Sequence, residues 1–415
     1  MAQPDSSFEE LRRAILHIQA ESGEGSMKKE KKKNRLQSVV MFLAFALLGG
    51  VCGLAMAPIL DSLNLPGGFF VIMAVLMVTV FLAVMVQIII HEAGHLVFGL
   101  LTGYEFSSFR IFSFMWIRQD GKIRFKRFSL AGTGGQCLLA PPPMVNGSFP
   151  VALYNLGGPL FNAISAVLFF VGALLGRNHP VVYSSCTVLA ITGLVLALTN
   201  GIPMRSGTVD NDGRNALSLR KNPEALRAFW IQMKISEQTA KGVRLKDMPE
   251  EWFQVPADDQ LDNSMISAQG VFAANRLMDA HRLEEADQLM AHLLDAAPGM
   301  IEMYRFLLIN DRIYCELLGE NRRDVIEGFL TKKQRKLTRA MRNSPTVIRT
   351  QYACALLSEH NEEQAEAIKQ RFQKLAKTYP YPTDLEAERE LMELAAQYSA
   401  ERRQGSGRRK NVYCH

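Results

Sequence analysis

Two histidines and a glutamate, spaced as His91-Glu92-Ala93-Gly94-His95, are the residues of this chain best suited to chemistry. Residues four apart on a helix share a face, so His91 and His95 can each offer an imidazole nitrogen to one metal ion. Glu92 then lies close enough to take a proton from water at that ion. Zinc suits this ligand set, and a third protein ligand would complete a catalytic site for one zinc ion per chain.

The helix that must carry this motif is strongly apolar. Residues 69–90, directly before His91, contain no charged side chain. That length is enough to span the hydrocarbon core of a bilayer. Ionisable groups at the end of such a helix are costly to desolvate, so we expect them to face a protein interior or a wet cavity. An accidental match to the motif is the alternative, and the membrane context makes it the weaker one.

Composition divides the chain of 415 residues into three parts. Long uncharged stretches lie within residues 38–202, whereas residues 214–415 are rich in Glu, Arg, Lys, Gln and Leu. We predict a basic tail over 1–37, a transmembrane domain with the metal site over 38–213, and a helical domain over 214–415. The net charge of +6 is too small to indicate a nucleic-acid partner. The six cysteines lack the paired spacing of a disulfide framework or a thiolate metal site.

Four apolar runs are long enough to cross a bilayer: Ser38–Leu60, Phe69–Leu101, Val151–Leu175 and Val181–Ile202. The lysines and arginines of residues 28–35 precede the first run and place the N-terminus in the cytoplasm. This run is too long for a cleavable signal peptide, and either Met1 or Met27 could be the start. Four spans return the chain to its starting side. We therefore predict a multi-pass protein of the cell membrane, surrounded by lipid, with both termini cytoplasmic.

Between the second and third spans, the sequence predicts a small β-hairpin over Ser107 to Leu130. Asp120-Gly121 is typical of a tight turn, and Ile123 and Phe125 alternate with basic residues as in a strand. A strand edge cannot face lipid unpaired, so the hairpin must lie at the membrane surface or against the protein. The Gly-rich segment 132–135 that follows is interpreted as a loop without a phosphate site, because no Lys-Ser/Thr follows it.

The C-terminal domain shows helical pairs over Arg276–Pro298, Met303–Asn343 and Thr346–Pro380. Tetratricopeptide-like repeats and a plain helical bundle both fit this pattern. Either could bind a protein partner.

A third metal ligand must come from another span that ends on the same side of the membrane as His91. The fourth span ends in the segment Asn200 to Gly213, and the antiparallel topology of the spans places it on that side. Within this segment, Asp210 and Asp212 are the acidic candidates. Asp-Asn-Asp-Gly is also an ordinary turn and helix-cap sequence, so it does not by itself indicate a ligand.

Taken together, these motifs resemble the site-2 protease family of intramembrane zinc metalloproteases, over residues 69–214. That family pairs an HExxH helix with a later span that bears Asn-x-x-Pro followed by Asp-Gly. The resemblance implies that zinc is bound by His91, His95 and Asp212 and that Glu92 is the catalytic base. The interval from Pro203 to Asp212 is longer than in the commoner family pattern, so Asp210 remains the alternative ligand.

Three further residues are implied by the same resemblance. Asn200 and Pro203 would shape the active-site loop and help to bind substrate. Asn162 ends a Gly-Pro-x-x-Asn element in the third span that is also similar to the family pattern. A re-entrant hairpin between the first two core helices is a further family feature.

The predicted fold is therefore an all-α polytopic membrane protein with about four transmembrane helices, a small re-entrant β-hairpin and a C-terminal helical domain. The implied activity is hydrolysis of peptide bonds in or near transmembrane segments of membrane proteins or peptide precursors. Two alternatives stay open. One is a non-proteolytic metal-binding membrane protein, and the other is a membrane-anchored helical-repeat scaffold.

Overall fold

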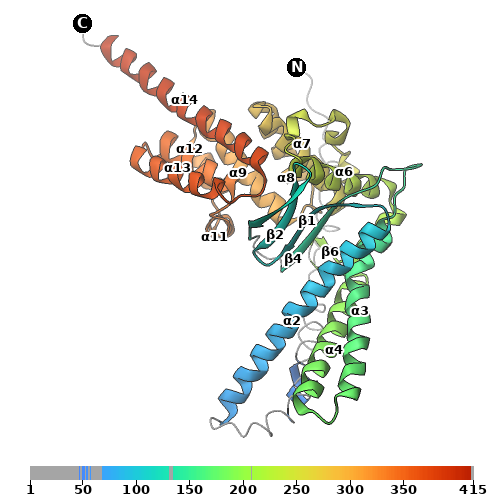
Figure 1. The fold of residues 1–415 in the computed structure, drawn as a ribbon. Coiled ribbons are helices and arrows are strands. Elements are labelled where there is room, and N and C mark those ends of the chain that lie inside the picture. Colours follow the sequence, from blue (N-terminus) through green and yellow to red (C-terminus); the bar gives the residue numbers. More distant parts are fainter. Residues whose placement is uncertain are drawn as a thin grey trace, which may run out of the picture. The chain divides into compact units, whose positions relative to one another are not determined.

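The computed structural model describes residues 68–129, 134–206 and 208–412, with a few positions between residues 46 and 57 (Figure 1). The basic tail and most of the predicted span Ser38–Leu60 lie outside the described residues. Contacts divide the chain into two units. Unit 1 takes the described part of Met1–Val84 together with Ser165–Val195, and unit 2 takes Met85–Ile164 and Leu196–His415.

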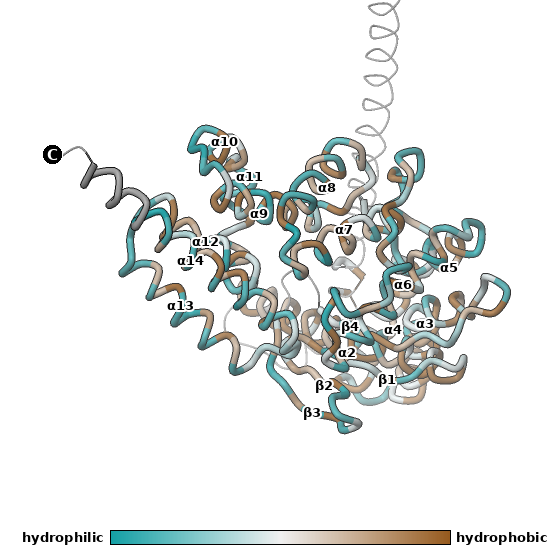
Figure 2. Tube along the Cα trace, turned by 90° about the horizontal axis from the view of Figure 1, so that it is seen from above, coloured by the Kyte–Doolittle hydropathy of each residue, from teal (hydrophilic) through white to brown (hydrophobic). Residues whose placement is uncertain are grey.

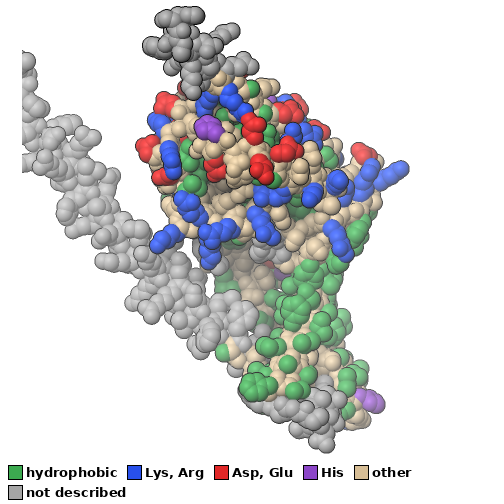
Figure 3. Space-filling model, turned by 90° about the vertical axis from the view of Figure 1, so that its left-hand side faces the viewer, with side chains coloured by type: hydrophobic (Ala, Val, Ile, Leu, Met, Phe, Trp, Pro, Cys, Tyr) green, Lys and Arg blue, Asp and Glu red, His purple; other side chains and the backbone are tan. Residues whose placement is uncertain are grey.

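Within the described residues, three helices are long and apolar enough to cross a membrane. They are α2 (Gly68–Leu101), α3 (Val151–Leu175) and α4 (Pro180–Gly201). Their outer surfaces carry exposed apolar side chains such as Phe81 and Leu168. Figure 3 shows hydrophobic side chains at the surface of these helices, whereas charged side chains cover the helices that follow them. The second, third and fourth predicted spans are thus confirmed as apolar helices.

The core of unit 1 is formed by α2 and α4. Ala83 and Val188 are buried there, and apolar side chains on both helices pack around them. Thr192 is also buried, and its hydroxyl donates to the carbonyl of Val188 at 2.8 Å. Polar groups at membrane depth are thereby satisfied within the helix, as a lipid environment requires.

An antiparallel sheet follows α2, and its strands lie in the order β3-β2-β1-β4. The strands are β1 (Glu105–Ile111), β2 (Phe114–Gln119), β3 (Lys122–Arg127) and β4 (Gly135–Ala140). Asp120 and Gly121 both have positive φ, which confirms the predicted turn between β2 and β3. Figure 1 shows β1, β2 and β4 next to the C-terminal part of α2.

Two predictions about this region need correction. The prediction of an all-α protein with one hairpin is too narrow, because the sheet has four strands and the remainder of the described chain is mostly helical. The predicted hairpin, Ser107 to Leu130, leaves out Gly135–Ala140, which forms β4 and pairs with β1 from Glu105 to Ile111. Its short sequence carries little strand pattern of its own, so pairing with β1, distant in sequence, determines its structure.

After α4 the described chain forms a small two-stranded sheet, β5 (Arg205–Ser206) and β6 (Val209–Asp210), followed by helices and the segments that connect them. The helices are α5 (Asp212–Ser218), α6 (Pro223–Ala240), α7 (Ser264–Asp279), α8 (Leu283–Ala296), α9 (Glu302–Leu318), α10 (Arg323–Phe329), α11 (Lys332–Ala340), α12 (Pro345–Leu357), α13 (Glu362–Ala376) and α14 (Pro382–Val412), with short 3₁₀ turns at Leu219–Lys221, Leu245–Asp247, Glu250–Phe253 and Asp258–Gln260. Figure 2 shows hydrophilic and hydrophobic positions alternating along α12 and α13.

Helical pairs are present at α7–α8 and α12–α13, and the first begins at Ser264 instead of the predicted Arg276. The segment predicted as the middle pair, Met303–Asn343, contains three helices, α9, α10 and α11, instead of two. A regular tetratricopeptide array therefore stays a prediction. The C-terminal region is helical.

A buried ion cluster organises this helical region. Arg349 on α12 is almost fully buried and pairs with Asp311 on α9 and with Glu388 on α14, the latter at 2.8 Å. Its guanidinium also lies over the Tyr314 ring, 4.3 Å from the centroid. Removing one partner of such a cluster would leave a buried charge uncompensated, so the cluster specifies how these helices pack.

One face of the sheet packs against the helical region. Met115 and Ile117 on β2 are buried there, and the surrounding side chains are Ala240, Phe128 and Tyr381. Gln119 at the end of β2 donates from Nε2 to the carbonyl of Pro380 at 2.7 Å. The helical region therefore forms part of the support of the sheet within unit 2.

Candidate metal centre

Helix α2 presents both motif histidines on one face, as their spacing predicts. The Nε2 atoms of His91 and His95 lie 3.1 Å apart, and the two rings meet edge to face. His95 is buried and His91 is partly buried, so the pair is largely withdrawn from solvent and lipid. The motif thus lies inside the protein, as the cost of exposing it to lipid requires.

The second nitrogen of each histidine is held by α3. His91 Nδ1 lies 2.7 Å from Asn162 Oδ1, and His95 Nδ1 lies 2.8 Å from the carbonyl of Tyr154. Both partners are acceptors, because the Asn162 amide group donates to the backbone carbonyl and side-chain oxygen of Gln87. Each Nδ1 therefore carries the proton, and each Nε2 offers a lone pair to a metal.

Glycines bring α3 into direct contact with the ligand helix. A Cβ on Gly94 would lie 2.2 Å from the carbonyl oxygen of Gly157, so the two backbones touch at this point. A Cβ on Gly158 would lie 2.5 Å from His91 Cε1 and 2.6 Å from His95 Nε2. Small residues allow this close approach of two membrane helices, and here they also leave room for the imidazoles.

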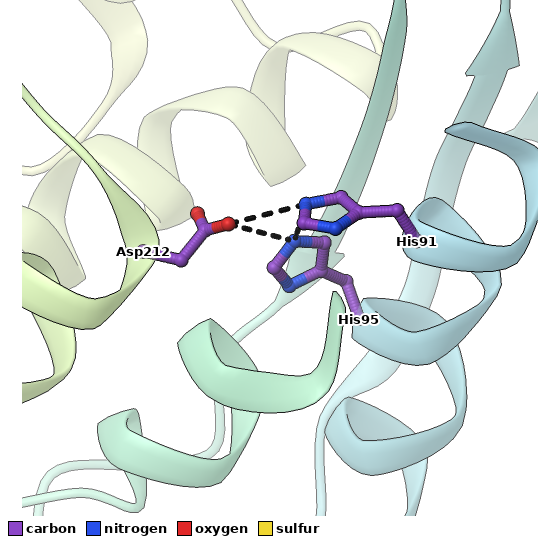
Figure 4. A group of neighbouring side chains, drawn as sticks. All are labelled: His91, His95 and Asp212. Carbon is purple, nitrogen blue, oxygen red and sulfur yellow. Dashed lines mark hydrogen bonds and ion pairs between the residues drawn. The ribbon is translucent and has the colours of Figure 1, made fainter. Parts of the chain in front are cut away.

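Asp212, the first residue of α5, completes the group. Its Oδ2 atom lies 3.1 Å from His91 Nε2 and 3.6 Å from His95 Nε2. Figure 4 shows the carboxylate pointing toward the two rings from the opposite side. Burial raises the pKa of the Asp212 carboxyl. A histidine that is protonated at Nε2 as well as Nδ1, as it can be without metal, donates to this carboxyl, and such hydrogen bonds and the imidazolium charge lower its pKa to about 2. Asp212 is thereby held ionised, as a metal ligand must be.

The distances between the two histidine Nε2 atoms and the Asp212 Oδ2 atom match those between ligands of a zinc ion. The ligand atoms of His91, His95 and Asp212 all lie within 4.8 Å of one another. A tetrahedral zinc ion with bonds of 2.0 to 2.1 Å separates its ligand atoms by roughly 3.3 Å, close to the distances seen here. Two imidazoles and a carboxylate also form a recurrent set for catalytic zinc that leaves the fourth position open.

The alternative ligand, Asp210, points elsewhere. Its Oδ1 atom lies 2.9 Å from Arg214 Nε and 3.5 Å from Arg205 Nε. The structure therefore brings Asp212 and not Asp210 to the histidines. This arrangement agrees with the choice made from the Asp-Gly pair.

The glycine after Asp212 has a steric reason to be there. A Cβ on Gly213 would lie 2.0 Å from the carbonyl oxygen of Gly201 at the end of α4. Only glycine allows α5 to begin this close to α4. The Asp-Gly pair is thus a close-packing requirement at this site, and it places the carboxylate directly beside the helix end.

The two remaining residues that the resemblance implies lie at the end of α4: Asn200 is in its last turn, and Pro203 follows it. Asn200 donates from Nδ2 to the carbonyl of Leu196 on its own helix, at 3.1 Å. Pro203 is exposed just beyond the end of α4. Their role in substrate binding stays a prediction. Asn211 caps α5 and accepts from the N–H of Arg214, which agrees with the interpretation of Asp-Asn-Asp-Gly as a cap sequence, although the sequence alone does not identify it as a residue of the site.

Glu92 lies against the start of β4. A Cβ on Gly135 would lie 2.5 Å from both Cγ and Oε1 of Glu92, so this glycine leaves the space that the carboxylate fills. Arg110 on β1 contacts the same strand end: its Nη2 donates to the carbonyl of Gly135 at 3.5 Å, and its Nη1 donates to the carbonyl of Phe112 at 2.7 Å. Arg110 is itself buried.

We expect Gly135→Ala to displace the Glu92 carboxylate. The hydrolytic activity that the sequence resemblance implies should then fall by about 100-fold, because small misplacements of a catalytic group cost that much. Zinc content should stay at the wild-type level, since no ligand is touched. Gly134→Ala is the matched control, because a Cβ there would meet only the flexible end of the Ile88 side chain, at 3.0 Å. Equal activity of the two variants would contradict this role of Gly135.

Comparison with known proteins gives one match. A family model described as peptidase family M50 matches residues 79–381, most of the chain. The match includes the HExxH helix, the sheet, Asp212 and much of the helical region. No curated protein and no solved structure matches the chain.

Proposed function

Because the chain belongs to peptidase family M50, the site-2 protease family, we propose that it is an intramembrane zinc metalloprotease. Family membership supports a membrane metallopeptidase. We further propose that its metal is zinc and that it cleaves in or near transmembrane segments. The observation that carries it is the convergence of His91, His95 and Asp212 beside Glu92 on an apolar helix.

The proposed chemistry assigns one role to each group. A zinc ion held by His91, His95 and Asp212 would polarise the scissile carbonyl and make water more acidic. Glu92 takes the proton from the attacking water and delivers it to the leaving amine. Asn162 keeps the His91 imidazole in the orientation that directs Nε2 toward the metal.

The proposed substrate is a transmembrane protein or a membrane-held peptide precursor. The site lies on apolar helices, and the exposed apolar surface of α2 near the motif includes Ile89 and Val97. A substrate helix in lipid could approach along such a surface. It must unwind locally, because an amide inside a helix has its carbonyl already hydrogen-bonded.

Cytoplasmic termini and a protein partner for the helical region are also proposals. Basic residues from Lys122 to Arg127 on β3 support a cytoplasmic location of the sheet by the positive-inside rule. The helical region packs on this sheet through Tyr381, so it would lie on the same side. A partner bound by the helical region would then act from the cytoplasm.

Metal removal tests the proposed function. The purified, detergent-solubilised full-length protein should contain about one zinc per chain, as expected for a site with three protein ligands. It should cleave a generic fusion protein that carries a transmembrane segment. A chelator should abolish this cleavage, and stoichiometric zinc should restore it. Metal content and cleavage are measured on the same samples.

The alternatives predict other outcomes. Bound zinc without cleavage of a panel of transmembrane segments would favour a non-proteolytic metal-binding protein. Absence of zinc from the folded protein would contradict the metal centre itself. It would leave a membrane-anchored scaffold, whose function would survive substitution of both His91 and His95.

A further inference from the structure

We infer that Asn211 is a positioning residue for the metal ligand Asp212: its side chain joins the end of α4 to the start of α5 and so fixes where the Asp212 carboxylate is presented. This inference rests on the proposed function, because it concerns the same metal site. It assigns the task to a residue outside the ligand set, one whose sequence context indicates only a turn or helix cap.

The loop between α4 and α5 leaves the helix end and returns to it. Strand β5 pairs with β6, with Arg205 opposite Asp210. The long interval between Pro203 and Asp212 therefore contains a small hairpin. Asn211 stands where the hairpin closes. Its backbone N–H donates to the carbonyl of Met204 at 3.1 Å, and the N–H of Met204 donates to Asn211 Oδ1 at 2.9 Å.

The side-chain amide of Asn211 forms hydrogen bonds both at the end of α4 and at the start of α5. Its Nδ2 donates to the carbonyls of Thr199 at 2.8 Å and Ile202 at 2.7 Å, at the end of α4. Carbonyls in the last turn of a helix lack partners within the helix, so they are natural acceptors for this amide. Its Oδ1 also accepts from the N–H of Arg214 at 3.0 Å, at the start of α5.

These four hydrogen bonds use the full capacity of an asparagine side chain, which has two donor hydrogens and an oxygen with two lone pairs. A helix cap alone needs only the bond to Arg214. The two bonds to α4 therefore have a separate consequence: they set the distance between α4 and the residue that follows Asn211. That residue is Asp212, and the contact of Gly213 with Gly201 leaves little room for error in this distance.

The chain provides a matched comparison in Asn222. Its side chain caps α6 by accepting from the N–H of Ala225 at 3.0 Å. Aspartate is as good a helix cap as asparagine. Asn222→Asp should therefore be nearly neutral. Asn211→Asp keeps the cap but loses both donors, and it places a negative oxygen against the carbonyls of Thr199 and Ile202.

The test measures zinc affinity of the full-length protein in detergent by competition with a chelator. We expect Asn211→Asp to bind zinc about 10- to 100-fold more weakly than wild type, the usual cost of losing a partner that orients a ligand. Asn211→Ser, which keeps a cap without the added charge, should shift in the same direction. Excess zinc should restore cleavage in both, and Asn222→Asp should match wild type.

Thermal unfolding of the zinc-free proteins separates positioning from general destabilisation. The inference requires zinc-free Asn211→Ser to unfold within a few degrees of wild type while its zinc affinity falls. Wild-type zinc affinity in both Asn211 variants would overturn it. So would a loss of stability without zinc that accounts for the whole change in affinity. Absence of zinc from the wild-type protein would instead contradict the proposed function.

Discussion

Glu92→Gln should lower cleavage of a transmembrane-segment fusion by about 100- to 10,000-fold, the usual contribution of a general acid–base group. Glutamine has nearly the shape of glutamate, so it can fill the space over Gly135 that the carboxylate occupies. It cannot take a proton from the attacking water. None of the three proposed metal ligands changes, so the variant should keep the zinc content of wild type.

The measurement is zinc content and cleavage rate for wild type and Glu92→Gln, purified side by side. Glu105→Gln is a matched control, since Glu105 starts the sheet with an exposed side chain, 3.8 Å from Arg118. It should behave as wild type. Cleavage by Glu92→Gln at the wild-type rate would remove Glu92 from its role as the base. Zinc lost together with activity would mean that Glu92 acts through the metal site.

The convergence of His91, His95 and Asp212 could be predicted from the sequence, because helical spacing and the order of the apolar runs can both be seen in it. The His91 and His95 spacing fixes a shared helix face, and the topology of apolar runs places the end of the fourth span on the same side. The choice of Asp212 needed family resemblance, since Asp210 has the same chemistry. The structure distinguishes them through Arg205 and Arg214, which pair with Asp210.

The features that could not be predicted depend on contacts between distant residues. The sequence of β4 has no clear alternation of apolar and polar residues, so its pairing with β1 could not be predicted. The contact of Gly135 with Glu92 depends on that pairing. Arg110 has the sequence context of a basic surface residue, yet the fold buries it. Asn211 looks like a helix cap, and its two bonds to α4 depend on how the loop closes. In each case the partner is chosen by packing and not by local sequence.

Asp212→Asn should weaken zinc binding by at least about 100-fold, more than is usual for a residue that only orients a ligand. The substitution keeps the size and the capped start of α5 but replaces a negative oxygen with a neutral amide. Asp210→Asn makes the same chemical change two residues earlier, where the carboxylate pairs with partly exposed arginines. Such pairs contribute little to stability. We therefore expect Asp210→Asn to keep its zinc.

Comparing these two variants tests the ligand assignment without depending on a substrate. Zinc affinity is measured by chelator competition on both proteins, and the thermal unfolding of the zinc-free forms checks that each is folded. The reverse order of affinities would identify Asp210 as the ligand and require the hairpin of β5 and β6 to rearrange when metal binds. Equal, wild-type affinities would exclude both carboxylates, and the third ligand would then lie outside the loop after α4.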